Sequence, residues 1–318
     1  MAEPLLLLDD VSKVFRKGRG SHIAVHRFNL ELTPDAAEIV TIAGESGSGK
    51  TTIAEMMLGI IQPTSGRLEY RGRPLADLTR RQRKAFRREV QPVFQDPFAS
   101  FNPFYRVRHV LDVVIRNFSL EGGTALIDET LEMVGLDGSA VLNRFPHELS
   151  GGQRQRIMMA RAYMLRPRII VADEPVSMVD ASLRTQILSV MQDMRDAAGI
   201  SFVYITHDLG TAYSASDRMF VLYRGATMES GPTRMVIDNA THPYTRQLVD
   251  STPTVSRPWT DRIEPLDEAA LAVDPRRQCP FAPRCPVVFG DCTRGPVEPR
   301  PVGEDHSCSC LLCAREAT

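Results

Sequence analysis

The 318-residue sequence has little net charge, no long apolar run and no cysteine before Cys279. Without a run of about 18 apolar residues, we expect no membrane-spanning helix. A formal net charge of −1 gives no general support for binding nucleic acid. The apolar run at 5–8 is too short for the core of a secretory signal, so we expect a buried strand there. These absences predict a protein of the cytosol, or one bound to a membrane face reached from the cytosol.

What is present is typical of a globular chain. Hydrophobic residues make up 43% and charged residues 24%, and the length fits one large domain or two unequal ones. The one strongly basic run, at 80–88, is interpreted as a solvated helix face that could lie near anionic lipid headgroups. Because all six cysteines follow position 278, we expect a separate C-terminal unit.

A glycine-rich segment at 44–51 (GESGSGKT) fits the phosphate-loop pattern G-x-x-x-x-G-K-[ST]. An apolar strand at 38–43 precedes it and a helical pattern at 52–58 follows, which is the context that the motif requires. In such a loop, backbone N–H groups surround the phosphates, Lys50 reaches the β and γ oxygens, and the Thr51 hydroxyl binds Mg²⁺. The flanking elements favour this interpretation over a chance glycine-rich turn.

Residues 144–175 combine two features of chemical interest. The turn Leu149 to Gln153 (LSGGQ) opens a helix, where free N–H groups and the helix dipole favour an anion. An ordinary helix cap is the simpler alternative. The apolar run that follows ends in Asp173 and Glu174. His207 ends another apolar strand and Gln95 follows a third, and ligands of parallel sheets bind at such strand ends.

This set of motifs, together with Asp180, resembles the nucleotide-binding subunits of ABC transporters over residues 5–250. The resemblance implies an α/β fold of the P-loop NTPase class. It comprises a RecA-like mixed sheet core, an antiparallel β subdomain, and an inserted α-helical subdomain at about 97–166. The implied domains are an ATPase domain at 1–250, a linker at 251–275 and a small cysteine-containing C-terminal extension at 276–318.

The resemblance also implies roles for single residues. Those implied to hold ATP are Phe15, Gly44, Glu45, Ser46, Gly47, Ser48, Gly49, Lys50, Thr51 and Thr52, and most relatives have Tyr at the position of Phe15. Those implied to serve hydrolysis are Lys50, Gln95, the general base Glu174, and His207 at the γ-phosphate. Those implied to hold Mg²⁺ are Thr51, Gln95 and Asp173.

Two further implications concern a partner subunit. Ser150, Gly151, Gly152 and Gln153 are implied to close over the ATP of a partner, so the working unit would be a dimer. Asp180 is implied to lie in the loop that couples the two ATP sites, and this loop reads SMVD where SALD is commoner.

The cysteines allow several interpretations. A cytosolic location disfavours disulfides, so Cys279, Cys285, Cys292 and Cys308 are candidate ligands of zinc or of an iron–sulfur cluster, or reduced thiols without metal. Their spacing matches no zinc pattern with paired C-x₂-C, and Cys310 and Cys313 exceed a four-ligand count. CPFAPRCP, with HPYTRQL, resembles the oligopeptide/dipeptide permease ATPases, and in that subfamily it implies a [4Fe–4S] cluster.

The resemblance implies an ATPase subunit of a peptide importer. Its partners would be a second, paralogous ATPase in a heterodimer, two transmembrane permeases and an extracytoplasmic solute-binding protein, and it would act at the cytoplasmic membrane face. Two alternatives are a soluble ABC ATPase acting on nucleic acid or ribosomes, and a module that does not hydrolyse ATP. A single phosphate loop and a net charge near zero disfavour the first, and the presence of Glu174 and His207 disfavours the second.

Overall fold

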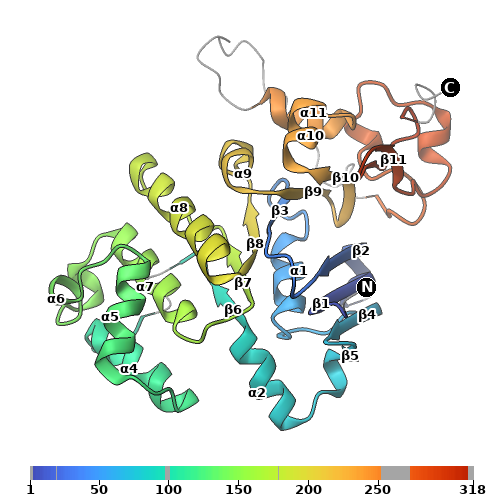
Figure 1. Cartoon of the computed structure of the whole chain (residues 1–318). Helices are drawn as coiled ribbons and strands as arrows, with labels where there is room; N and C mark the ends of the chain where they lie inside the picture. Colours follow the sequence, from blue (N-terminus) through green and yellow to red (C-terminus); the bar gives the residue numbers. More distant parts are fainter. Residues whose placement is uncertain (1–2, 19, 97–100, 178, 252–272, 314–318) are drawn as a thin grey trace.

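A computed structural model describes residues 3–18, 20–96, 101–177, 179–251 and 273–313 of the chain. A central sheet runs between a helical region on one side and a small antiparallel sheet on the other, and the C-terminal segment lies beside the edge of the central sheet (Figure 1). Most of the predicted linker at 251–275 lies outside the described residues, and the predicted domain boundaries stay predictions.

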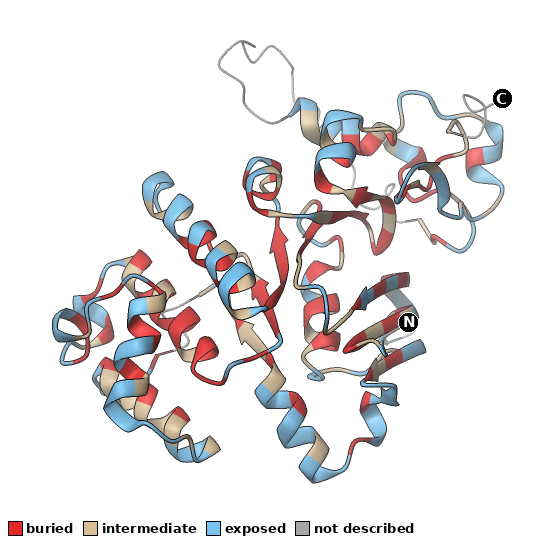
Figure 2. Cartoon of the chain, in the orientation of Figure 1, coloured by how far each residue is buried: buried red, intermediate tan, exposed pale blue. Residues whose placement is uncertain are grey.

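The central sheet has eight strands in the order β11-β12-β10-β9-β3-β8-β7-β6. Its strands are β3 (Ile39–Ala43), β6 (Val90–Val93), β7 (Ile169–Asp173), β8 (Ser201–Thr206), β9 (Arg218–Tyr223), β10 (Ala226–Pro232), β11 (Arg300–Gly303) and β12 (His306–Cys308). The pairings among β6, β7, β8, β3 and β9 are all parallel. Strands β3 and β8 are buried along their whole length, as in a parallel sheet covered on both faces (Figure 2).

The second sheet is antiparallel, with strand order β2-β1-β4-β5. Its strands are β1 (Leu6–Lys17), β2 (Gly20–Leu32), β4 (Ser65–Tyr70) and β5 (Arg73–Pro74). The sequence suggests a polar loop at 16–21, but pairing continues there as far as Lys17 and Gly20. Main-chain pairing therefore extends into a polar segment whose side chains do not alternate between apolar and polar.

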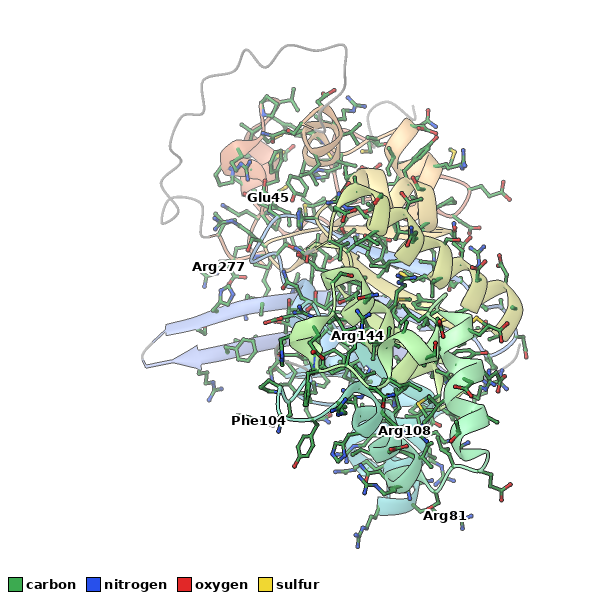
Figure 3. The ribbon with its side chains drawn as sticks, turned by 90° about the vertical axis from the view of Figure 1, so that its left-hand side faces the viewer. Glu45, Arg81, Phe104, Arg108, Arg144 and Arg277 are labelled. Atoms are coloured by element: carbon green, nitrogen blue, oxygen red, sulfur yellow. The ribbon has the colours of Figure 1, made fainter. Side chains whose placement is uncertain are left out.

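The helices cover the faces of the central sheet and form the separate helical region. They are α1 (Lys50–Met57), α2 (Arg80–Glu89), α4 (Val107–Phe118), α5 (Gly123–Met133), α6 (Gly138–Val141), α7 (Gly151–Tyr163), α8 (Ala181–Ala198), α9 (Leu209–Ala215), α10 (Thr233–Asp238) and α11 (Pro243–Asp250). The basic run forms α2, and its Arg81 lies at the edge of the molecule (Figure 3). Among the described residues, no helix is long and apolar enough to cross a membrane.

Residues 233–250 form two helices, α10 and α11. The second helix begins at Pro243, a residue that is compatible with a first helical turn but not with a helix interior. His242 caps it, because the Nδ1 atom of His242 accepts a hydrogen bond from the Tyr244 backbone N–H at 3.0 Å.

The described residues 273–313, called the C-terminal module below, join the central sheet. Strand β12 pairs with β10, with Glu229 opposite Cys308 and Ser230 opposite Ser307. Phe281 is fully buried and packs against Tyr223 of β9 and Tyr244 of α11, with ring centroids 5.3 Å away in both cases. The module therefore shares its core with the central sheet and with α11.

His242 gives the fold a predicted sensitivity to acid. It is 1% exposed, and burial lowers its pKa from 6.5 to about 4. Between these two pH values the unfolded chain takes up a proton that the folded chain does not, so stability falls as the pH drops through this window. We expect this residue to account for a loss of about 3 kcal/mol between pH 7 and pH 4.

Denaturant unfolding at pH 7 and at pH 4 measures this loss. His242→Asn retains an oxygen that can cap α11 but does not titrate, so its stability should depend less on pH. An equal loss of stability in the wild type and in His242→Asn would exclude His242 as the source.

Candidate nucleotide site

The phosphate loop leaves β3 and turns into α1. Gly49 has φ +103°, and a Cβ atom there would lie 2.2 Å from the backbone oxygen of Ala24. Only glycine therefore fits this position without displacing β2. The loop is fixed further by the Gly225 N–H, which donates to the Ser48 carbonyl at 2.9 Å.

Lys50 lies inside the loop and is 7% exposed. Its Nζ donates to the carbonyl oxygens of Gly44 and Glu45, both at 2.8 Å. Burial lowers the pKa of Lys50, and attraction to Glu174 and Asp173 acts in the opposite direction. The ammonium group thus lies among acceptors at the position where the motif predicts phosphate oxygens.

A cavity of about 720 Å³ opens over this loop. It is lined by Phe15, His22, Ala24, Ser46, Gly47, Gly49, Lys50, Thr51, Thr52, Gln95, Asp173, Glu174 and His207. Phe15, which is among the residues implied to hold ATP, is 41% exposed and borders this cavity. Sequence reasoning missed His22, which lies opposite Phe15 in the pairing of β1 with β2.

Two predicted catalytic residues, Gln95 and His207, contact the carboxylate of a third, Glu174. The Gln95 Nε2 donates to Glu174 Oε2 at 3.0 Å, and the His207 Nδ1 lies 3.0 Å from Glu174 Oε1. The Glu174 side chain is 18% exposed, whereas that of His207 is 63% exposed at the cavity mouth. A carboxylate held in this way, facing the phosphate loop, can orient a water molecule and accept its proton.

The backbone of Glu174 has a left-handed conformation, with φ +45°. For a residue with a side chain this costs about 1–3 kcal/mol. Three hydrogen bonds hold it. The Glu174 N–H donates to Ile205 O at 2.9 Å, and the hydroxyl and N–H of Ser177 donate to Glu174 O at 3.0 and 3.2 Å. The turn after β7 thus points this carboxylate into the cavity.

Asp173 and Thr51, two of the predicted Mg²⁺ ligands, lie next to each other. The Thr51 hydroxyl lies 3.4 Å from Asp173 Oδ2. Burial, and then the neighbouring Glu174, raises the pKa of Asp173. Two adjacent carboxylates and a hydroxyl are donors that Mg²⁺ prefers, and its charge would offset their repulsion. Gln95, the third predicted ligand, contacts Glu174 instead.

The LSGGQ turn forms the capped start of α7. The Ser150 hydroxyl accepts from the Gln153 N–H at 3.2 Å, and the Gln153 side chain accepts from the Ser150 N–H at 3.0 Å. A Cβ on Gly152 would lie 2.7 Å from Leu183, so glycine allows α7 to pack closely on α8. The cavity over the phosphate loop is lined by other described residues and not by 150–153.

Asp180 begins α8. Its Oδ1 accepts from the backbone N–H groups of Ser182 and Leu183 at 3.1 and 3.0 Å. These hydrogen bonds lower the pKa of Asp180, so the helix cap is ionised at neutral pH.

The predicted cysteine ligands are not brought together as a set. Cys279, Cys285, Cys292 and Cys310 line a pocket of about 10 Å³, room for about one water molecule. Cys308, which was expected in this group, instead contacts the Cys313 sulfur at 3.0 Å. Burial raises the pKa of Cys279 to about 11, so this thiol keeps its proton at neutral pH.

Within the described part of the chain, no group of three or more His, Cys, Asp or Glu side chains is arranged to hold a metal ion. All six cysteines are free thiols. The expected iron–sulfur cluster is therefore not supported. Cys308 pairs with Glu229 of β10 and does not line the cysteine-lined pocket, and that pocket, at about 10 Å³, is too small for a cluster.

Comparison with protein families supports the interpretation of these motifs. The ABC transporter family matches residues 27–177, and the family described as oligopeptide/dipeptide transporter, C-terminal region, matches residues 228–292. A putative peptide import ATP-binding protein of Brucella abortus is 38% identical, covering 98% of this chain and 94% of the relative. The oligopeptide transport ATP-binding protein AppF of Bacillus subtilis is 34% identical and covers 98% of both chains.

Solved structures are similar over the ATPase region. The ATP-binding cassette MJ0796, in a dimeric post-hydrolysis state bound to ADP and Pi, is 27% identical with a TM-score of 0.62. It covers 72% of this chain and 99% of that one. CbiO1 of Clostridium perfringens, at 24% identity and a TM-score of 0.65, shares the fold over 74% of this chain and 91% of its own. The predicted P-loop NTPase fold is confirmed, and the chain belongs to the ATP-binding subunits of ABC transporters, in the oligopeptide/dipeptide transporter branch of that family.

Proposed function

We propose that this chain hydrolyses ATP to drive the uptake of oligopeptides or dipeptides through partner permeases at the cytoplasmic face of the membrane. The convergence of Gln95 and His207 on Glu174, beside the phosphate loop, is the observation that carries the hydrolytic part. The match of residues 228–292 to the oligopeptide/dipeptide transporter C-terminal region, together with the names of the relatives, supports peptide as the solute.

The proposed mechanism assigns one task to each side chain. Lys50 exchanges its carbonyl contacts for phosphate oxygens, and the loop N–H groups bind the remaining ones. Glu174 orients the attacking water and accepts its proton, while Gln95 and His207 hold the carboxylate in place. Thr51 and Asp173 would hold Mg²⁺, which neutralises charge that develops on the phosphates.

The working unit in this proposal is a dimer with two composite sites. Residues 150–153 lie outside the cavity of their own chain and begin a 13-residue helix, so they are available to a partner's γ-phosphate. Asp180, at the start of α8, is proposed to couple the sites, because α8 also contacts α7 at Gly152. A paralogous ATPase, two permeases and a solute-binding protein complete the proposed assembly.

The permeases are proposed to contact the segment that follows Gln95. Phe104 is 85% exposed and Tyr105 is 47% exposed in that region, and Phe104 lies at the surface of the molecule (Figure 3). Aromatic side chains are enriched in protein–protein interfaces, which supports this assignment.

Uptake of a radiolabelled dipeptide and of a labelled oligopeptide tests the proposal, in cells whose chromosomal gene is replaced by variants. Lys50→Ala should abolish uptake of at least one of these peptides, because the phosphate ligand is lost. Lys84→Ala, on the exposed helix α2, is the matched control and should retain it. Undiminished uptake of both peptides in Lys50→Ala cells would reject peptide import.

A further inference from the structure

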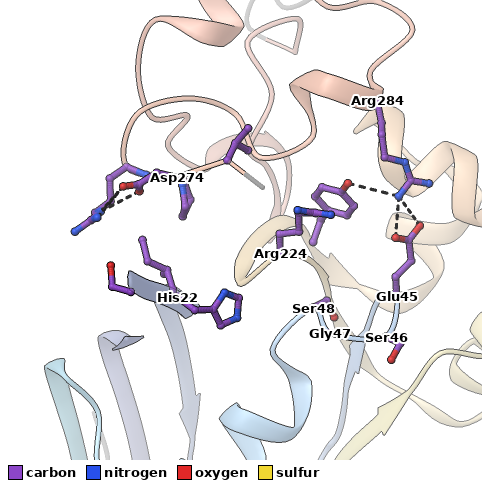
Figure 4. Close-up of a pocket in the computed structure, with 14 residues that line it drawn as sticks. His22, Glu45, Ser46, Gly47, Ser48, Arg224, Asp274 and Arg284 are labelled. Atoms are coloured by element: carbon purple, nitrogen blue, oxygen red, sulfur yellow. Dashed lines mark hydrogen bonds and ion pairs between the residues drawn. The ribbon is translucent and has the colours of Figure 1, made fainter. Parts of the chain in front are cut away.

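The C-terminal module touches the phosphate loop through one ion pair. The Arg284 Nη1 lies 3.0 Å and 2.8 Å from the two carboxylate oxygens of Glu45, the second residue of the loop (Figure 4). These residues are 239 positions apart in the sequence. They line a second cavity of about 710 Å³, together with Ser46, Gly47 and Ser48 of the loop. Asp274 and Arg276 of the module line it as well.

Arg284 is held in position by its surroundings. It is the last residue of the short helix η3 (Ala282–Arg284). This helix begins directly after Phe281, which is fully buried. Its guanidinium lies 5.6 Å from the centroid of the Tyr223 ring, and its side chain is only 15% exposed. An arginine fixed by this packing loses less conformational freedom when it pairs with a carboxylate.

The backbone of Glu45 makes hydrogen bonds that help to hold the phosphate loop. Its N–H donates to the Tyr244 hydroxyl at 3.1 Å, so a second contact holds it from α11. Its carbonyl oxygen accepts from Lys50 Nζ at 2.8 Å and from the Ser48 N–H at 3.2 Å. The side chain of Glu45 thus pairs with Arg284 of the module, and its carbonyl oxygen accepts a hydrogen bond from Lys50, the predicted phosphate ligand.

The charge of Glu45 is unfavourable for a triphosphate bound in the same loop. At 40% exposure the carboxylate is only partly solvated, and Arg284 is its ion-pair partner. We propose that Arg284 is a positioning residue for ATP binding, which acts through Glu45 by holding and neutralising this carboxylate beside the triphosphate. The inference rests on the proposed ATPase function, and it does not depend on the solute that is transported.

The full chain and three variants test this inference by titration with MgATP. Arg284→Ala leaves Glu45 unneutralised and should raise the Kd for ATP about fivefold, a moderate effect because the pair is partly solvated. Adding Glu45→Gln to Arg284→Ala removes the unpaired charge and should restore at least half of the lost affinity on a logarithmic scale. Arg294→Ala is the matched control, because it removes an exposed ion pair inside the same module.

The rescue separates this role from a purely structural one, because a displaced module would not be repaired by a change at Glu45. Thermal unfolding shows whether each variant is folded, and Arg284→Gln replaces the alanine variant if that one is not. Unchanged ATP affinity in Arg284→Ala, or a loss that Glu45→Gln does not reverse, would overturn the inference. Wild-type chain that binds no ATP would instead contradict the proposed ATPase function, and the inference with it.

Discussion

Glu174→Gln is expected to bind ATP as the wild type does and to hydrolyse it at least about 100-fold more slowly. The glutamine has the same size and can still contact Gln95 and His207, so the cavity should keep its shape. It cannot take the proton of the attacking water, and a positioned general base typically contributes about 10²–10⁴-fold to the rate. Binding of a fluorescent ATP analogue and release of phosphate measure the two parts separately.

Glu69→Gln is the matched control for this prediction. Glu69 lies on β4, away from the cavity, and its side chain is 18% exposed, the same fraction as for Glu174. Turnover of this variant should equal that of the wild type. Turnover near the wild-type rate in Glu174→Gln would remove Glu174 from the role of general base.

Glu229→Ala is expected to lower the free energy of unfolding by about 3–5 kcal/mol. The Glu229 side chain is fully buried, and its oxygens accept from the N–H groups of Thr241 and His242 at 2.8 and 3.0 Å. Its third partner is His306 of the C-terminal module, whose Nε2 lies 2.8 Å away. The alanine variant would leave all three groups buried without this acceptor, and each such group costs about 1–3 kcal/mol.

Denaturant unfolding gives the total loss, and hydrogen exchange in residues 273–313 shows whether the module opens first. Glu298→Ala is the matched control, because its ion pair with Arg27 is exposed on both sides and should contribute less than about 1 kcal/mol. Equal stability of Glu229→Ala and the wild type would show that this buried pair does not fasten the module.

The residues around Glu174 could be predicted from the sequence because of one regularity. Gln95, Glu174 and His207 follow three apolar runs, and the strands formed by those runs are parallel neighbours. Parallel strands bring their carboxyl ends to one edge of the sheet, so residues far apart in the chain meet there. The phosphate loop follows a fourth strand of the same sheet, and its motif specifies its own backbone geometry.

Other contacts depend on register and docking, which local patterns do not encode. His22 reaches the cavity because it pairs with Phe15, in a segment whose polar sequence predicts a loop. Cys310, and not Cys308, lines the pocket with Cys279, Cys285 and Cys292, and the pairing of β12 with β10 that places Cys308 is not encoded in the spacing of the cysteines. The contact of Arg284 with Glu45 depends on how the module packs around Phe281, which the sequence does not reveal.

Ser150→Arg tests the proposal that residues 150–153 of one subunit complete the ATP site of its partner. The new side chain would block the capped start of α7, which lies outside the cavity of its own chain. We predict that the isolated variant binds ATP with the affinity of the wild type, and that the assembled transporter containing it loses ATP hydrolysis. If Ser150→Arg instead weakens ATP binding by the isolated chain as strongly as Lys50→Ala does, the turn serves its own site and the dimeric account is contradicted.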